Sequence, residues 1–188
     1  INDVVFPGGY SEVFATASSG DIRVWNARTC AELLRIQVPT VTCKCICFAK
    51  DGKSILSGWS DGKVRSFGPQ SGKLLFVIND AHSGDVCAIA ACNDMQRIVT
   101  GGSDRRVRLW KWDGDGPAES PAGDIAAHDG WVEGIAFSPD GTRVASVGAD
   151  LKLKLWDVAR LTPIKVVSAH MGIPRDLSFS RDGKWIVT

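Results

Sequence analysis

Short runs of alternating apolar and polar residues recur along the chain at intervals of roughly ten residues, the spacing of strands in all-β proteins. Four of these runs end on an aromatic residue, at Trp25, Phe67, Trp110 and Trp156. Alternation with a period of two is typical of strands, and no stretch sustains the 3.6-residue period of an amphipathic helix. The pattern therefore predicts an all-β protein.

The four aromatic residues belong to a repeat, because 42, 43 and 46 residues separate one from the next. Three of the predicted first strands are followed by an Asp-Gly pair, a strong hairpin signal. Repeats of about 40–45 residues with four strands each build β-propellers. We divide the chain into units of about 1–42, 43–85, 86–131 and 132–173, with a truncated fifth unit over 174–188. The longest interval contains a polar insert at 113–121, which predicts a lengthened loop.

A second set of residues keeps the same spacing as the aromatic residues. A histidine stands 28 residues before Trp110 and Trp156, a hydroxyl residue follows each histidine by 18, and an aspartate lies six before each tryptophan. The two complete sets are His82, Thr100, Asp104 and Trp110, and His128, Ser146, Asp150 and Trp156. The second unit keeps Ser57, Asp61 and Phe67 but has Pro39 for the histidine, and the fifth keeps His170 and Thr188.

In these motifs the chain resembles the WD40 repeat family along its whole length, with a full Trp-Asp pair at Trp156. The resemblance implies a hydrogen-bonded tetrad of His, Ser/Thr, Asp and Trp that braces each blade. It carries over completely to the third and fourth units. The first unit has Ala15 and Ser19 at the polar positions, so we expect no tetrad there. The predicted fold is a WD40 β-propeller of four blades plus the start of a fifth, part of a larger propeller, because an open ring leaves a strand edge unprotected.

Composition and charge give no sign of a nucleic-acid or membrane partner. The net charge is +1, which creates no global field for either surface. No apolar run approaches the roughly 20 residues that span a bilayer. Six unevenly spaced cysteines fit a reducing compartment, so we expect a cytoplasmic protein.

Motifs that look like catalytic or metal sites have simpler structural explanations. Residues 58–62 match G-x-S-x-G, but that motif needs a strand-turn-helix context that a hairpin lacks. Cys43, Cys45 and Cys47 lie on one face of a predicted strand without zinc-site spacing, so we expect core packing. Residues 113–116 lack the later ligands of a calcium loop, and the histidines repeat as braces would. We predict no enzyme activity, no cofactor and no metal.

Two surfaces are candidates for binding other proteins. The loops beside the tetrads open on one rim and present Trp59, Ser60, Asp85, Trp131, Glu133 and Arg175. Aromatic and arginine residues often anchor interfaces, although each tryptophan could equally lie flat on a neighbouring blade. The second surface is the basic strand with Arg105, Arg106 and Arg108, which either meets an acidic partner or discourages edge pairing.

Residues 1 to about 112 show a closer resemblance through segments such as INDVVFPGG, FATASSGDIRVWN and DGKSILSGWSDGKVRSFGPQSGKLLFVINDAH. They resemble the cilia- and flagella-associated WD-repeat proteins of axonemal doublet microtubules and their relatives in the centriole wall. The resemblance implies a structural cytoskeletal component that binds tubulin or microtubule-associated proteins in a cilium, flagellum or centriole. Two other classes remain open: a soluble adaptor that reads peptides at the rim in signalling or ubiquitin ligation, and an enzyme built on a propeller.

Overall fold

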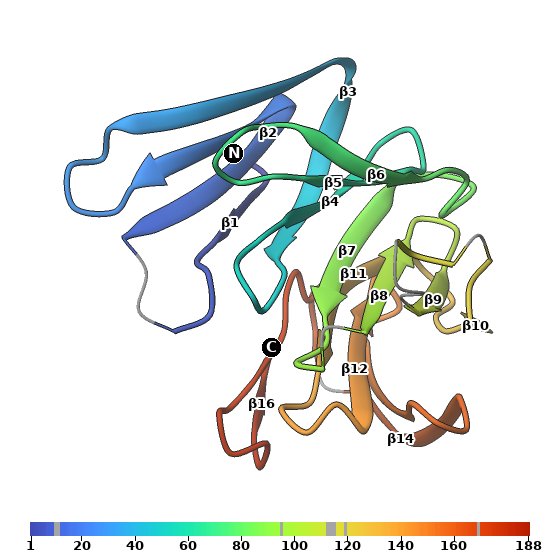
Figure 1. Ribbon diagram of the computed structural model, residues 1–188. Coiled ribbons are helices and arrows are strands. Elements are labelled where there is room, and N and C mark those ends of the chain that lie inside the picture. Colours follow the sequence, from blue (N-terminus) through green and yellow to red (C-terminus); the bar gives the residue numbers. More distant parts are fainter. Residues whose placement is uncertain (10–11, 95, 112–115, 119, 169) are drawn as a thin grey trace.

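The computed structural model describes residues 1–9, 12–94, 96–111, 116–118, 120–168 and 170–188. Within these ranges the chain forms antiparallel β-sheets and no helix (Figure 1), which confirms the all-β prediction. A helix long and apolar enough to cross a membrane is likewise absent from the described residues.

The first two sheets share a strand and contain β1 (Asp3–Val5), β2 (Val13–Asn26), β3 (Glu32–Phe48), β4 (Ile55–Trp59), β5 (Val64–Phe67) and β6 (Leu74–Ile78). β2 folds back on itself around Gly20, because the N–H of Ala27 donates to the carbonyl of Glu12 near its two ends. β3 pairs with β2 through residues 32–42 and with β4 through residues 43–48. Each long strand therefore supplies two arms, and blades one and two each have four.

The later sheets are separate. Blade three contains β7 (Val86–Ala91), β8 (Arg97–Gly102), β9 (Arg106–Lys111) and β10 (Gly123–Ala126), and blade four contains β11 (Val132–Phe137), β12 (Arg143–Gly148), β13 (Lys152–Asp157) and β14 (Thr162–Ser168). β15 (Ser178–Phe179) and β16 (Ile186–Val187) start a fifth blade. The polar insert connects β9 to β10, and its residues 113–115, on which the calcium-loop comparison rests, lie outside the described residues together with residue 119. The limits assigned to the sequence units stay a prediction.

Successive blades pack through their first strands. β3 contacts β7, β7 contacts β11 and β11 contacts β15, so the first strands stand side by side around a central space (Figure 1). Apolar residues fill the space between neighbouring sheets, as between Val99 and Leu109 of blade three and Val144 and Trp156 of blade four. The blades approach so closely that a Cβ atom at Gly101 would lie 2.4 Å from Val132 Cγ1. This is the architecture of a partial propeller.

Candidate partner-binding site

A buried hydrogen-bond network ties together the loops of blade three. The indole N–H of Trp110 donates to Thr100 Oγ1 at 3.0 Å, and Thr100 Oγ1 lies 2.8 Å from His82 Nε2. An ionised carboxylate can only accept, so the His82 proton sits on Nδ1 toward Asp104, and Nε2 accepts from the Thr100 hydroxyl. Nδ1 lies 2.8 Å from Asp104 Oδ1. The chain of bonds therefore runs from strand β9 through β8 to both loops.

Blade four repeats the geometry closely. Trp156 Nε1 donates to Ser146 Oγ at 2.9 Å, His128 Nε2 lies 2.8 Å from Ser146 Oγ, and His128 Nδ1 lies 2.8 Å from Asp150 Oδ1. Asp150 also accepts the backbone N–H groups of Asp129 and Lys152. Asp104 and Asp150 thus each hold the loop that precedes their blade against the hairpin turn between the second and third strands of the same blade. The stabilising role of the two networks stays a prediction.

The pKa shifts in the two networks favour the protonation states that hold the loops together. Burial alone would raise the pKa of Asp104 and of Asp150, but hydrogen bonds from the paired histidines, from Arg108 and from backbone N–H groups together outweigh it and hold both pKa values below the ordinary range. Burial also lowers the pKa of His128, so this ring stays neutral near pH 7. Every nitrogen of the two rings has a protein partner, and none points into open space toward a substrate.

Blade two has a donor that the sequence analysis assigned to the surface. Trp59 is 0% exposed, and its indole N–H donates to Ser57 Oγ at 2.8 Å. Phe67 is buried without a donor, so Trp59 supplies the bond that Trp110 and Trp156 supply elsewhere. The interpretation of Trp59 as a partner contact is therefore wrong, because its side chain is enclosed by the core of blades one and two. The sequence held no signal for this, since Trp59 lies outside the repeating aromatic position.

Blade one also has more of the network than expected. The indole N–H of Trp25 donates to Thr16 Oγ1 at 2.9 Å, and Asp21 accepts from Ser18 and from Arg23. The spacing of the other blades predicted the polar positions of blade one at Ala15 and Ser19, and this was wrong. The hydroxyl residue is Thr16, because this hairpin has one residue fewer between the hydroxyl and the tryptophan than blades three and four. At the other end of the chain, Thr188 Oγ1 and His170 Nε2 form the corresponding bond of the fifth unit.

The predicted basic surface is largely neutralised. Arg106 pairs with Asp124 at 2.6 Å, and Arg108 pairs with Asp104 at 2.8 Å while its side chain is only 14% exposed. An acidic partner therefore cannot use these two arginines without breaking ion pairs within blade three. Arg105 is exposed and has no ion pair among the described residues. The strand thus lacks the continuous positive surface that its sequence suggested.

The remaining candidates divide between contacts inside the propeller and exposed groups on the rim. Ser60 Oγ accepts the backbone N–H of Thr42, and Asp85 pairs with Lys44 of blade two at 2.7 Å. Glu133 pairs at 3.1 Å with Arg175, whose side chain is 74% exposed. Trp131 is 54% exposed. Ser60 and Asp85 therefore join neighbouring blades or strands, whereas Trp131 and Arg175 face outward.

Trp131 belongs to an exposed apolar group that crosses two neighbouring blades. Glu133 contacts Arg175, and a Cβ atom at Gly134 would lie 3.0 Å from Asp176 Cα, so these two segments run side by side in register. Trp131 and Ile173 each precede the ion-paired residue of their own segment by two positions, and they are 54% and 44% exposed. Met171, two residues before Ile173, is fully exposed. We call Trp131, Met171 and Ile173 the rim patch.

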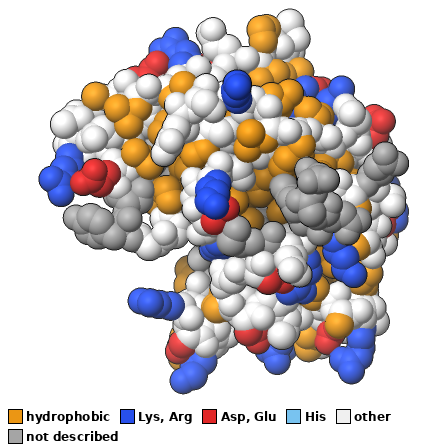
Figure 2. All heavy atoms as spheres, in the orientation of Figure 1, with side chains coloured by type: hydrophobic (Ala, Val, Ile, Leu, Met, Phe, Trp, Pro, Cys, Tyr) orange, Lys and Arg blue, Asp and Glu red, His pale blue; other side chains and the backbone are white. Residues whose placement is uncertain are grey.

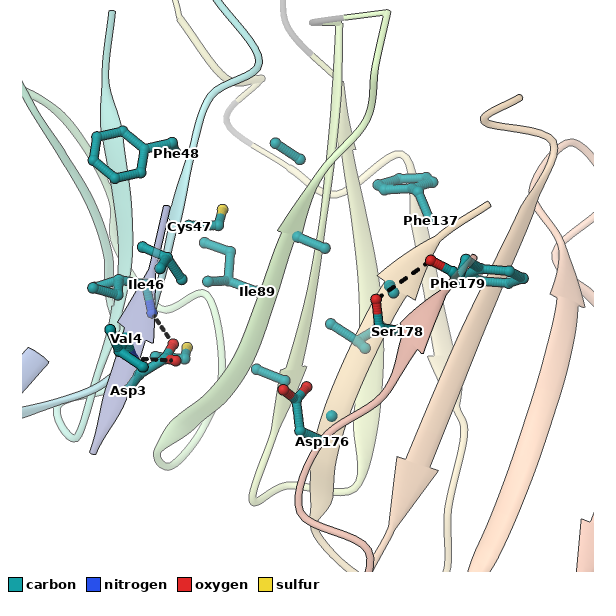
Figure 3. Close-up of a pocket in the computed structure, with 18 of the residues that line it drawn as sticks. Asp3, Val4, Ile46, Cys47, Phe48, Ile89, Phe137, Asp176, Ser178 and Phe179 are labelled. Carbon is teal, nitrogen blue, oxygen red and sulfur yellow. Dashed lines mark hydrogen bonds between the residues drawn. The ribbon is translucent and has the colours of Figure 1, made fainter. Parts of the chain in front are cut away.

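A cavity of about 650 Å³ lies between the first strands β1, β3, β7, β11 and β15 (Figure 3). Asp3 and Asp176 come from opposite sides of this space, and Asp3 Oδ2 accepts the N–H of Ile46 at 2.8 Å. Burial raises the pKa of Asp3, and the charge of Asp176 adds to the effect. Apolar side chains such as Val4 and Ile89 share the wall. No group of three metal-binding side chains occurs among the described residues.

Four of the cysteines are held in the protonated form by burial. Cys43 and Cys45 are buried, and burial raises the pKa of both thiols. Burial likewise raises the pKa of Cys47 and of Cys87 to about 12, which keeps both groups protonated at neutral pH. The thiols of β3 therefore serve as small apolar side chains.

Comparison with known proteins matches the same repeats. The family model for the WD domain, G-beta repeat, matches residues 33–67, 72–111 and 119–157. Cilia- and flagella-associated protein 52 is 50% identical over 111 residues in Homo sapiens and 53% identical over 111 residues in Chlamydomonas reinhardtii, covering 59% of this chain and 18% of each relative. U3 small nucleolar RNA-associated protein 12 of Saccharomyces cerevisiae is 31% identical over 102 residues, 53% of this chain and 10% of the yeast protein. The chain thus spans about 18% of the length of its ciliary relatives. Because the repeat model covers more than half of the residues, the chain belongs to the WD40 repeat family.

Proposed function

We propose that this chain is a non-enzymatic scaffold of cilia or flagella that binds a structural protein partner through its rim patch. The observation that carries the proposal is the exposure of Trp131, Met171 and Ile173; Trp131 stands on a loop whose backbone is fixed by the buried tetrad of blade four. A fixed backbone with large exposed apolar side chains favours binding, because little conformational entropy is lost when the partner docks.

The ciliary assignment is supported by the relatives. Proteins named cilia- and flagella-associated protein 52 are about half identical to this chain over the matched residues. From that name and the resemblance of residues 1 to about 112, we infer a place on the microtubules of the axoneme, with tubulin or a microtubule-associated protein as the partner. Arg175 stands beside the rim patch, but its guanidinium pairs with Glu133, so the exposed apolar side chains carry the proposed contact.

The test is microtubule co-sedimentation of the full-length protein with axonemal doublets. We expect Trp131→Ala to weaken binding by about tenfold or more, as truncation of an interface anchor does. Leu33→Ala is the matched control, because Leu33 is as exposed as Trp131 but lies on the outer strand of blade one. Equal binding by the two variants would overturn the role of the rim patch.

Localisation and co-purification separate the alternatives. A tagged full-length protein should stain the axoneme, whereas staining confined to centrioles would indicate the centriole-wall role. Diffuse staining, together with co-purification of ubiquitin-ligase or signalling subunits and no tubulin, would identify an adaptor instead.

A further inference from the structure

Two large side chains fill the junction between blades three and four. The guanidinium of Arg97, the first residue of β8, lies 5.9 Å from the ring centroid of Phe137, the last residue of β11. A Cβ atom at Gly141, in the turn after β11, would lie 3.0 Å from Arg97 Nη2, so the arginine reaches across to blade four. Arg97 and Phe137 together close the space between these two blades at the ends of their first strands.

The junction between blades two and three lacks both of these side chains. Ser54 takes the position of Arg97, since each stands 13 residues before the repeating aromatic residue of its blade. Ala91 takes the position of Phe137, since each is the last residue of the first strand of its blade. A cavity of about 130 Å³ remains here, and its lining includes Lys50, Ser54, Leu56, Ala91, Cys92 and Ile98. From this difference we propose that the cavity binds an aromatic side chain from an acidic segment of a partner protein.

The size and the lining of the cavity fit one aromatic ring. Leu56, Cys92 and Ile98 are at most 3% exposed and give the cavity an apolar wall. An apolar cavity of about 150 Å³ in another protein binds benzene, whose ring is that of phenylalanine. Close packing leaves few voids of this size inside a folded protein. A ring supplied by the partner would take the place that Phe137 holds at the next junction.

Charge selects an acidic segment as the source of the ring. Lys50 borders the cavity and Lys53 lies in the same turn, and neither has an ion pair among the described residues. Asp51 accepts the backbone N–H of Lys53, and Arg97 on the other side of the cavity pairs with Asp94. The two turns together carry three cations and two carboxylates, which leaves an excess of positive charge. Carboxylates on either side of the ring would complement it, and such complementarity selects the partner.

The cavity lies at the opposite end of the first strands from the rim patch. The turns that follow β3 and β7 border the cavity, whereas the rim patch stands on the loops that precede β11 and β15. Lys and Arg side chains project near the centre of the face in Figure 2, where Figure 1 places the turn between β3 and β4, with hydrophobic side chains exposed beside them. The inference is therefore independent of the function proposed for the rim patch.

Saturation-transfer difference NMR of the full-length protein with the peptide Glu-Glu-Glu-Phe-Glu-Glu-Glu tests the proposal. We expect the ring protons of the phenylalanine to receive the largest saturation, because the ring is the part of the peptide that enters the cavity. A peptide with alanine in place of phenylalanine, and one with lysine in place of every glutamate, should each bind at least about tenfold more weakly.

Two substitutions introduce the side chains of the next junction and so fill the cavity. Ala91→Phe and Ser54→Arg should each weaken binding of the phenylalanine peptide by about tenfold or more. Ser54→Arg adds a positive charge, so its effect cannot come from repulsion of the acidic peptide. Ser83→Arg, the same change at an exposed serine in the loop before β7, is the matched control and should bind as the parent protein does.

The role of charge is tested by Lys50→Glu, which should weaken binding by about threefold or more. Lys63→Glu, in the turn between β4 and β5 at the other end of blade two, should leave binding unchanged. Thermal unfolding midpoints establish that the variants are folded, and if one cavity variant is unstable the other decides. Equal binding of the alanine peptide, equal or tighter binding of the lysine peptide, parent-like binding by a folded cavity variant, or an equal loss in either control variant would each overturn the proposal.

Discussion

The indole of Trp59 donates its N–H to Ser57 Oγ, 2.8 Å away on the same strand, and takes the place of the tryptophan that blade two lacks at position 67. The hydroxyl of Ser57 then donates to the carbonyl of Arg65 on the next strand. The Arg65 guanidinium lies 5.4 Å from the centroid of the Trp59 ring. In blade two the indole and the hydroxyl thus lie on one strand, β4, whereas in blades three and four the indole comes from the following strand.

Replacing Trp59 with phenylalanine should destabilise the protein by about 2–4 kcal/mol, because the change leaves a void in a closed core and a buried hydroxyl without its donor. The effect is measured by urea unfolding, with circular dichroism as the signal. Trp131→Phe is the control, and because Trp131 is on the surface we expect a change within about 0.5 kcal/mol. Equal effects of the two substitutions would contradict the burial of Trp59.

Asp150 should be the most sensitive residue of the blade-four network. Its carboxylate accepts from His128 and from the backbone N–H groups of Asp129 and Lys152, so Asp150→Ala leaves the buried His128 Nδ1–H and two backbone N–H groups without their partner. We expect a loss of about 2–4 kcal/mol in the free energy of unfolding. Asp129→Ala removes a carboxylate that is 81% exposed and pairs only with Lys152, and should cost less than about 1 kcal/mol. A smaller loss for Asp150→Ala than for Asp129→Ala would refute the bracing role.

The stability of the protein should fall as the pH drops below the ordinary His128 pKa of 6.5. Burial lowers this pKa in the folded protein, so below 6.5 the unfolded chain binds a proton that the folded protein does not, and unfolding is favoured. The lowered pKa of Asp150 acts in the same direction but only as the pH approaches 3.8.

Unfolding midpoints recorded from neutral pH to about pH 5 should therefore decline in the parent protein, and the decline should be smaller in His128→Asn, which has no imidazole to titrate. A parallel decline in both proteins would assign the effect to other groups.

Gly62 should tolerate no side chain. It lies in the hairpin turn of blade two with φ +74, and a Cβ atom there would lie 2.2 Å from the carbonyl oxygen of His82. We expect Gly62→Ala to cost more than about 3 kcal/mol, because both the backbone conformation and the contact with blade three are disturbed. Gly52→Ala, at φ +68 with no atom within 4 Å, isolates the backbone term, for which we expect about 1–2 kcal/mol. Thermal unfolding of both variants checks the difference, and similar costs would show that the contact between the blades is not tight.

The sequence alone determined the fold class, the repeat and the residues of two complete tetrads. The reason is that the members of each tetrad lie within 28 residues of one another, on two adjacent strands and the loops that join them. Local spacing therefore sets which side chains meet. The same reasoning misplaced the polar residues of blade one, because a shorter turn changes the spacing without changing the strands.

Only the tertiary structure decided which side chains are available to a partner. The sequence predicted both Trp59 and Trp131 on the rim, yet Trp59 ends strand β4 and is enclosed between blades, whereas Trp131 is open to solvent. Arg106 and Arg108 look like free cations until β10 brings Asp124 beside them, and Lys44 meets Asp85 only because two blades stand side by side. Exposure and ion pairing depend on how separate sheets approach one another. The spacing of residues along one strand does not determine the distance between two sheets.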